Sequence, residues 1–75
     1  MAEQSTLLLG LGSVLREARA ERRVSQEELG LHTGVHRNYI GGIERGERNP
    51  SVTTIATLAD ALDLKLSELF ARAGN

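Results

Sequence analysis

Two short helical segments joined by a tight turn that contains one glycine lie in the middle of the chain, and this arrangement constrains the fold more than any other feature. Ser25 stands three residues before Glu28, which is the spacing of a capping box, so a helix is expected over about 26–33. Gly34 supplies the left-handed residue that ends this helix. A second helix is expected over about 37–45. Two such helices cannot bury a core alone, so other helices must complete the domain.

Three further helices are expected where apolar residues recur at three- and four-residue spacing, and they cover about residues 8–22, 52–62 and 66–72. Gly10 and Gly12 weaken the first turns of the first one, and residues 1–6 are expected to fray. The buried stripe of the second comprises Val52, Ile55, Leu58, Ala59 and Leu62. Lys65 is a poor capping residue for the third. The sequence therefore predicts an all-α domain of five helices.

The composition fits one small globular domain and limits its partners. The 75 residues carry 9 Lys and Arg against 10 Asp and Glu, so a nucleic acid would have to meet a local basic patch. Cysteine is absent, which excludes a disulfide framework and fits a cytosol. The apolar run 7–9 is too short to span a membrane, so no membrane partner is expected. No zinc motif, phosphate loop or acid pair in an apolar setting occurs, so neither enzyme activity nor a cofactor is expected.

The middle of the chain resembles a known family. Residues 25–29 followed by Gly34-Val35, together with the stretch 39–51, resemble the XRE-like helix-turn-helix family of phage repressors and Cro proteins. This resemblance extends over about residues 11–70. Within the family, the stretch 36–45 is most similar to the controller proteins of bacterial restriction–modification systems.

The resemblance implies a fold and a function. The fold is a single lambda-repressor-like domain over residues 1–75, with a helix-turn-helix at about 25–45 and a dimerisation surface at about 58–72. The second helix of such a motif enters the major groove of double-stranded DNA. The implied function is a homodimeric, sequence-specific transcriptional regulator that binds a near-palindromic operator at its own promoter, in the bacterial cytoplasm at the nucleoid.

Nine residues are expected to contact DNA. Arg37 and Asn38 open the recognition helix, from which an arginine can bond guanine and an asparagine adenine. The resemblance and the helix N-termini imply phosphate contacts for most of the others. The full set is Gln26, His36, Arg37, Asn38, Tyr39, Gly42, Arg45, Arg48 and Asn49. A solvated polar surface is the alternative at these positions. If Glu44 is paired with Arg19, the charges of Arg37, Arg45 and Arg48 are expected to stay largely free for DNA.

Several of these positions keep two interpretations. His36 either touches a phosphate or serves as a poor helix cap, and Tyr39 either meets a phosphate or packs as a structural ring. Gly41 and Gly42 either let the helix approach the groove or serve close helix packing. His32 and His36 are four residues apart, but the glycine turn separates them and no third ligand is evident, so no metal site is expected.

Two expectations concern the scaffold. Arg19 and Glu44 match a family pair that forms a partly buried ion pair. The C-terminal third holds more large apolar residues than so small a domain is expected to bury, and the exposed remainder would form the dimer interface. The predicted interface residues are Leu58, Leu62, Leu64, Leu66, Leu69 and Phe70. The alternative is that they complete the core of one chain.

Other functions are weighed against the controller protein. One is a general phage-repressor-like regulator. Another is an antitoxin-like or bridging module that holds another protein, although such modules usually carry a tail and only residues 71–75 follow Phe70. An RNA partner is disfavoured because stacking aromatic residues are nearly absent. RNA polymerase is a further candidate partner, and the sequence leaves open whether the regulator activates or represses.

Overall fold

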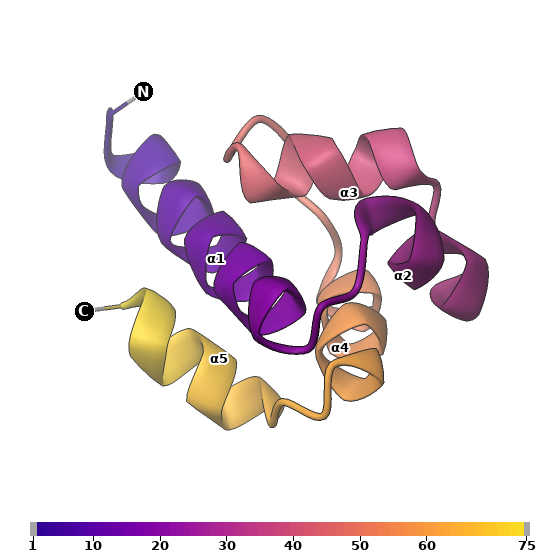
Figure 1. The fold of residues 1–75 in the computed structure, drawn as a ribbon. Coiled ribbons are helices and arrows are strands. Elements are labelled where there is room, and N and C mark those ends of the chain that lie inside the picture. Colours follow the sequence, from indigo (N-terminus) through magenta and orange to yellow (C-terminus); the bar gives the residue numbers. More distant parts are fainter. Residues whose placement is uncertain (1, 75) are drawn as a thin grey trace.

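The computed structural model describes residues 2–74, and within them the chain forms five helices and no strand. Figure 1 shows their arrangement. The helices are α1 (Ala2–Glu21), α2 (Gln26–Thr33), α3 (Arg37–Glu44), α4 (Val52–Ala61) and α5 (Leu66–Ala73). The predicted all-α, five-helix class is therefore confirmed.

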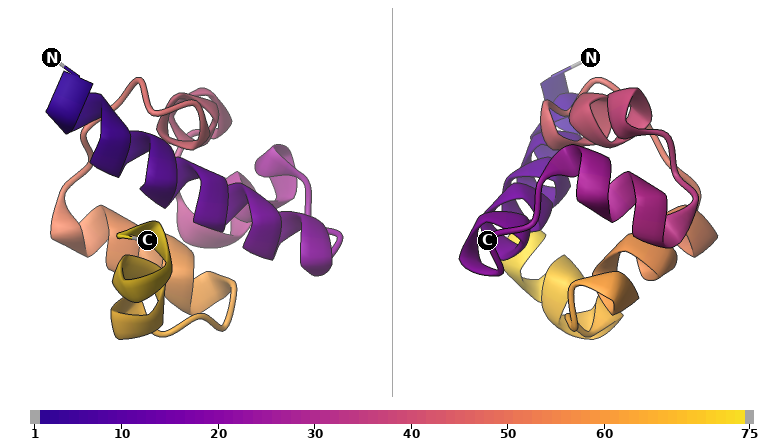
Figure 2. Two further views of the ribbon diagram at one scale, coloured as in Figure 1. Left: turned by 90° about the vertical axis from the view of Figure 1, so that its left-hand side faces the viewer. Right: turned by 45° about the vertical axis from the view of Figure 1, so that its right-hand side comes forward.

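One aliphatic core joins the five helices. The left view of Figure 2 shows the long helix α1 crossing the near face of the bundle, and this helix contacts both α3 and α5. Helix α4 packs against α2 and α5 at the other end. The buried apolar residues are Leu11, Val14, Leu15, Ala18, Leu29, Ile40, Ile43, Ile55, Leu58, Ala59, Leu62, Leu64 and Leu69. Because α3 contributes two isoleucines to this core, its orientation is fixed by the scaffold behind it.

Helix α1 differs from the sequence prediction at its start. It begins at Ala2, so the expected fraying is wrong for residues 2–6, whereas Met1 lies outside the described residues. A Cβ atom on Gly12 would lie 2.3 Å from the carbonyl oxygen of Ile43, and one on Gly10 would lie 2.5 Å from that of Ala73. The glycines thus allow α1 to approach the C-terminal ends of α3 and α5. This packing supports the helix despite their low helix propensity.

The helix-turn-helix begins and ends where the sequence predicts. The Ser25 hydroxyl accepts a hydrogen bond from the Glu28 backbone N–H at 2.9 Å, and the Ser25 N–H donates to the Glu28 carboxylate at 2.8 Å. This completes the predicted capping box. Gly34 ends α2 with φ of 81°, which is the left-handed conformation that favours glycine. A local signal therefore marks each end of α2.

The C-terminal helices correct two predictions. Val52 is 63% exposed and does not belong to the buried stripe, because it occupies the first turn of α4 where the helix leaves the core. Four predicted interface residues are instead core residues of this chain: Leu58, Leu62, Leu64 and Leu69. These four leucines pack in the shared core of the helices. They therefore expose almost no surface to a second copy of the chain. Of the predicted set, Leu66 is half-buried and Phe70 is 38% exposed.

Candidate nucleic-acid interface

The helix-turn-helix presents the two halves of α3 differently. Arg37 and Asn38 at its N-terminal end are exposed, whereas every residue from Ile40 to Glu44 is buried. Tyr39 lies between these parts and is half-buried. The side chains that can reach a ligand are therefore confined to the first turn of the helix, where the sequence predicts base contacts.

His36 caps the exposed end of α3. Its Nδ1 atom accepts a hydrogen bond from the backbone N–H of Asn38 at 3.0 Å. An accepting Nδ1 carries no proton, so in the neutral ring the hydrogen belongs to Nε2. His36 is thus a helix cap, and its Nε2–H remains an additional donor. A phosphate contact by this donor stays a prediction.

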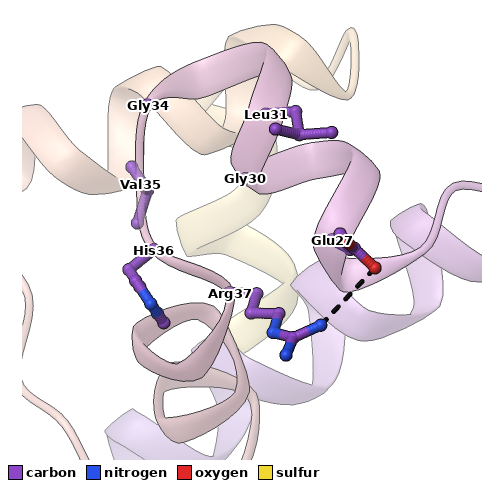
Figure 3. A pocket seen from close by; sticks show the side chains of 7 residues that line it. All are labelled: Glu27, Gly30, Leu31, Gly34, Val35, His36 and Arg37. Carbon is purple, nitrogen blue, oxygen red and sulfur yellow. Dashed lines mark ion pairs between the residues drawn. The ribbon is translucent and has the colours of Figure 1, made fainter.

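Two of the arginines expected to be free have carboxylate partners. Arg37 Nη1 lies 3.5 Å from Glu27 Oε1, and Figure 3 shows this pair at the mouth of an open groove between α2 and α3. The groove has a volume of about 420 Å³ and is lined by Glu27, Gly30, Leu31, Gly34, Val35, His36 and Arg37. Arg45 Nε lies 3.1 Å from Glu47 Oε1. All four side chains are more than half exposed, and such surface pairs contribute little to stability, so neither arginine is held firmly by its partner.

Glu44 anchors the buried end of α3. Its carboxylate accepts hydrogen bonds from Arg19 Nε at 2.7 Å and Arg19 Nη2 at 3.0 Å, which is a bidentate pair between α1 and α3. Gln26 Nε2 donates to the same carboxylate at 3.0 Å and thereby joins α2 to the pair. The Glu44 side chain is only 4% exposed. The expected ion pair is present, and it ties three helices together.

Arg19 is held in place from both sides. Besides its bonds to Glu44, its Nη1 donates to the backbone oxygen of Val24 at 2.9 Å. The hydrogen bond with Glu44 raises the pKa of Arg19 above its ordinary value, which burial alone would lower. No buried side-chain nitrogen or oxygen lacks a hydrogen-bond partner in the part of the chain that the structure describes. The pair therefore meets the condition under which a buried charge is tolerated.

The two central glycines of α3 are covered by side chains. A Cβ atom on Gly42 would lie 2.7 Å from Arg48 Cγ, and one on Gly41 would lie 3.1 Å from Arg45 Nη1 and 3.4 Å from Gln26 Oε1. Gly42 is buried, so the prediction that it touches DNA directly is wrong for this conformation. Gly42 makes room for the Arg48 side chain. Gly41 lets Gln26 of α2 lie close to the backbone of α3, so it serves the packing of these two helices.

The remaining predicted residues lie at the start of α2 and in the segment that follows α3. Arg48 and Asn49 are exposed in the segment that follows α3, and the Arg48 guanidinium carbon lies 6.0 Å from the centroid of the Tyr39 ring. Gln26 opens α2, with its side-chain amide occupied by Glu44. Sequence reasoning missed Glu27 and Glu47 as partners of the arginines. Glu27 is on a different helix from Arg37, so no spacing rule connects them.

Within residues 2–74, no three side chains among His, Cys, Asp and Glu come together as metal ligands would. None of the five helices there has both the length and the apolar character that crossing a membrane requires.

Comparison with known proteins identifies the family of this chain. The helix-turn-helix family model matches residues 15–69. The control protein C.SmaI of Serratia marcescens is 41% identical over 64 residues, which cover 85% of this chain and 76% of that protein.

Solved structures agree with the family model. The crystal structure of the restriction–modification controller protein C.AhdI from Aeromonas hydrophila superposes with a TM-score of 0.80 at 48% identity, covering 84% of this chain and 96% of that one. The restriction–modification controller protein C.Esp1396I, solved as a tetramer in complex with its natural 35 base-pair operator, gives a TM-score of 0.79 at 28% identity over 89% of this chain and 88% of that one. The chain described here belongs to the helix-turn-helix family, and controller proteins of restriction–modification systems are among its similar relatives.

Proposed function

We propose that the protein is a sequence-specific DNA-binding transcription regulator of the restriction–modification controller type. The observation that carries this proposal is the division of α3 into an exposed first turn and a buried, anchored remainder. Arg37 and Asn38 enter the major groove and read base edges, an arginine by bonding guanine and an asparagine by bonding adenine. Similarity to C.SmaI and C.AhdI supports the controller assignment.

Phosphate contacts surround the base-reading pair in this proposal. The donors are the Nε2–H of His36, the hydroxyl of Tyr39, the N-terminus of α2 at Gln26, and the side chains of Arg45, Arg48 and Asn49. The carboxylates of Glu27 and Glu47 lower the net positive charge of this surface. Non-specific affinity is therefore modest, and specificity rests on base contacts and on the geometry of two copies.

The proposed active form is a homodimer on a near-palindromic operator. Two recognition helices about 34 Å apart would enter successive major grooves on one face of DNA. The proposed contact uses α5, where Phe70 and the half-buried Leu66 keep some apolar surface exposed after the core is filled. The tetramer described for C.Esp1396I on its operator supports assembly of more than one copy.

RNA polymerase is a further proposed partner, reached when the operator lies beside a promoter. The distance between operator and promoter then decides whether the bound protein activates or represses. The proposed location is the bacterial cytoplasm, at the nucleoid.

A titration with the DNA that precedes the protein's own gene tests the proposal. Wild-type protein is titrated into this duplex and into a scrambled duplex of equal length, at two salt concentrations. Specific binding predicts an affinity for the native duplex at least about 10³-fold higher than for the scrambled one. Equal affinities for both duplexes would overturn the proposal. Sedimentation of the free protein at rising concentration tests the dimer, and Phe70→Lys is expected to leave it monomeric.

A further inference from the structure

Arg48 is folded back over the recognition helix. Its Cγ atom lies 2.7 Å from the position of a Cβ on Gly42, and its Nε and Cδ atoms lie 3.4 and 3.6 Å from it. The stem of the arginine therefore lies directly on the backbone of α3 at that residue. No residue with a side chain can occupy position 42 while Arg48 lies there, because a separation of 2.7 Å between carbon atoms is far below van der Waals contact.

Tyr39 holds the other end of the same side chain. The guanidinium carbon of Arg48 lies 6.0 Å from the centroid of the Tyr39 ring, at the outer limit of a cation–π contact. Tyr39 and Gly42 are three residues apart on one helix, so they share a face. The Tyr39 ring and the backbone at Gly42 together form the surface on which the Arg48 side chain lies. This surface is called the seat below.

The charge of Arg48 remains available. Among the residues that the structure describes, Arg37 and Arg45 have carboxylate partners, and Arg48 takes part in none of the ion pairs. A long side chain normally loses rotamer freedom when it binds, and prior placement reduces this loss. An arginine that is both placed and unneutralised is suited to a phosphate oxygen.

We infer that Gly42 and Tyr39 are positioning residues that hold Arg48 ready for a phosphate of the bound DNA, so that Gly42 acts through an arginine and touches no DNA itself. This inference rests on the proposed function, since it concerns the same interface. It assigns the mid-helix glycine a role that is indirect and depends on a residue outside the helix.

The seat is tested first without DNA, by nuclear magnetic resonance of the Arg48 side chain. The Arg48 Hε and Hδ signals are expected to show a ring-current shift in wild-type protein and in Tyr39→Phe. Tyr39→Leu and Gly42→Ala are expected to lose it. The matched control is Gly41→Ala, whose new Cβ would meet only the flexible ends of Arg45 and Gln26, and which should keep the shift. Unchanged Arg48 signals in Gly42→Ala would overturn the inference.

DNA binding supplies the second test. Gly42→Ala is expected to weaken binding about tenfold and to reduce the slope of log affinity against log salt by about one, as Arg48→Ala does. The double variant should bind no worse than Arg48→Ala alone, because both changes remove one contact. Gly41→Ala does not displace Arg48, so Arg48→Ala should weaken binding by the same factor in the Gly41→Ala background as in the wild type. Additive losses in the double variant would show a direct contact at Gly42 and overturn the inference.

The two tests separate this inference from the proposed function. If wild-type protein binds no specific DNA, the proposed function fails, and the nuclear magnetic resonance result still decides whether the seat exists. If wild-type protein binds and Gly42→Ala binds equally well, only the inference fails. Thermal unfolding of Gly42→Ala monitors its fold, and alanine is expected to preserve or raise the melting temperature because it favours helix. If this variant does not fold, Tyr39→Leu against Tyr39→Phe decides the same question.

Discussion

The two ends of α3 have opposite environments. At the N-terminal end Arg37 and Asn38 are exposed, and their contacts are one cap and one surface ion pair. At the C-terminal end Glu44 is buried and bonded to side chains from two other helices. An eight-residue helix is marginal in water by itself, so one end must be fixed if the other is to present side chains accurately. Binding and stability are thereby assigned to different residues of the same helix.

The largest effect is expected from breaking the anchored end. Glu44→Ala leaves the partly buried guanidinium of Arg19 without its carboxylate and should lower the free energy of unfolding by about 3–5 kcal/mol. Urea denaturation followed by circular dichroism measures this change. The matched control is Glu47→Ala, which removes an exposed pair and should cost about 1 kcal/mol or less. Similar values for the two variants would show that the anchor is not electrostatic.

The same end can be disturbed from α1. Gly12→Ala places a methyl group 2.3 Å from the carbonyl oxygen of Ile43, so α1 and α3 must separate. We expect destabilisation of about 1–3 kcal/mol, measured by thermal and urea unfolding. Alanine alone would stabilise a helix by about 1 kcal/mol relative to glycine, so the sign of the effect is informative. A more stable variant would contradict the close approach.

The exposed end is expected to respond more weakly to loss of its cap. His36→Ala removes the acceptor for the Asn38 N–H and should cost about 1 kcal/mol of stability. His36→Ser supplies another capping oxygen and should restore the melting temperature. If DNA affinity falls in both variants while stability is rescued only in the second, the Nε2–H of His36 also contacts DNA. Equal melting temperatures for alanine and serine would rule out a capping role.

The smallest change in stability should come from the carboxylate beside Arg37. Glu27→Gln removes an exposed ion pair and should change the free energy of unfolding by about 0.5 kcal/mol or less. Affinity for operator DNA should rise for two reasons. Arg37 no longer has to leave the Glu27 carboxylate before it binds DNA, and the interface loses one negative charge. Fluorescence anisotropy with labelled duplex measures this. A fall in affinity would mean that Glu27 orients Arg37 and does not compete for it.

The features that the sequence predicts correctly depend mostly on local signals. The cap at Ser25, the left-handed Gly34 and the five helices depend on residues close together in the chain, and these predictions are confirmed. The ion pair between Arg19 and Glu44 was expected only from the family resemblance, and it is present.

Tertiary packing explains what the sequence could not predict. The close approach of α1 to the backbone of α3 at Gly12 is a contact between distant residues, which no periodicity reveals. The burial of Leu58 and Leu69 depends on the space between helices, and a count of apolar residues does not measure that space. The partners of Arg37 and Arg48 lie on other elements or across a turn, so spacing along one helix does not identify them.

Selection from random DNA duplexes, followed by sequencing, tests the central claim most directly. Wild-type protein and Arg37→Ala are compared at one fixed salt concentration, after unfolding measurements confirm that both are folded. The account predicts that the wild type enriches a short near-palindrome with half-sites about one helical turn apart, and that the variant loses or relaxes one base preference in each half-site. No enrichment by folded wild-type protein at any salt concentration, or the same motif from both proteins, would contradict reading of DNA by the exposed end of α3.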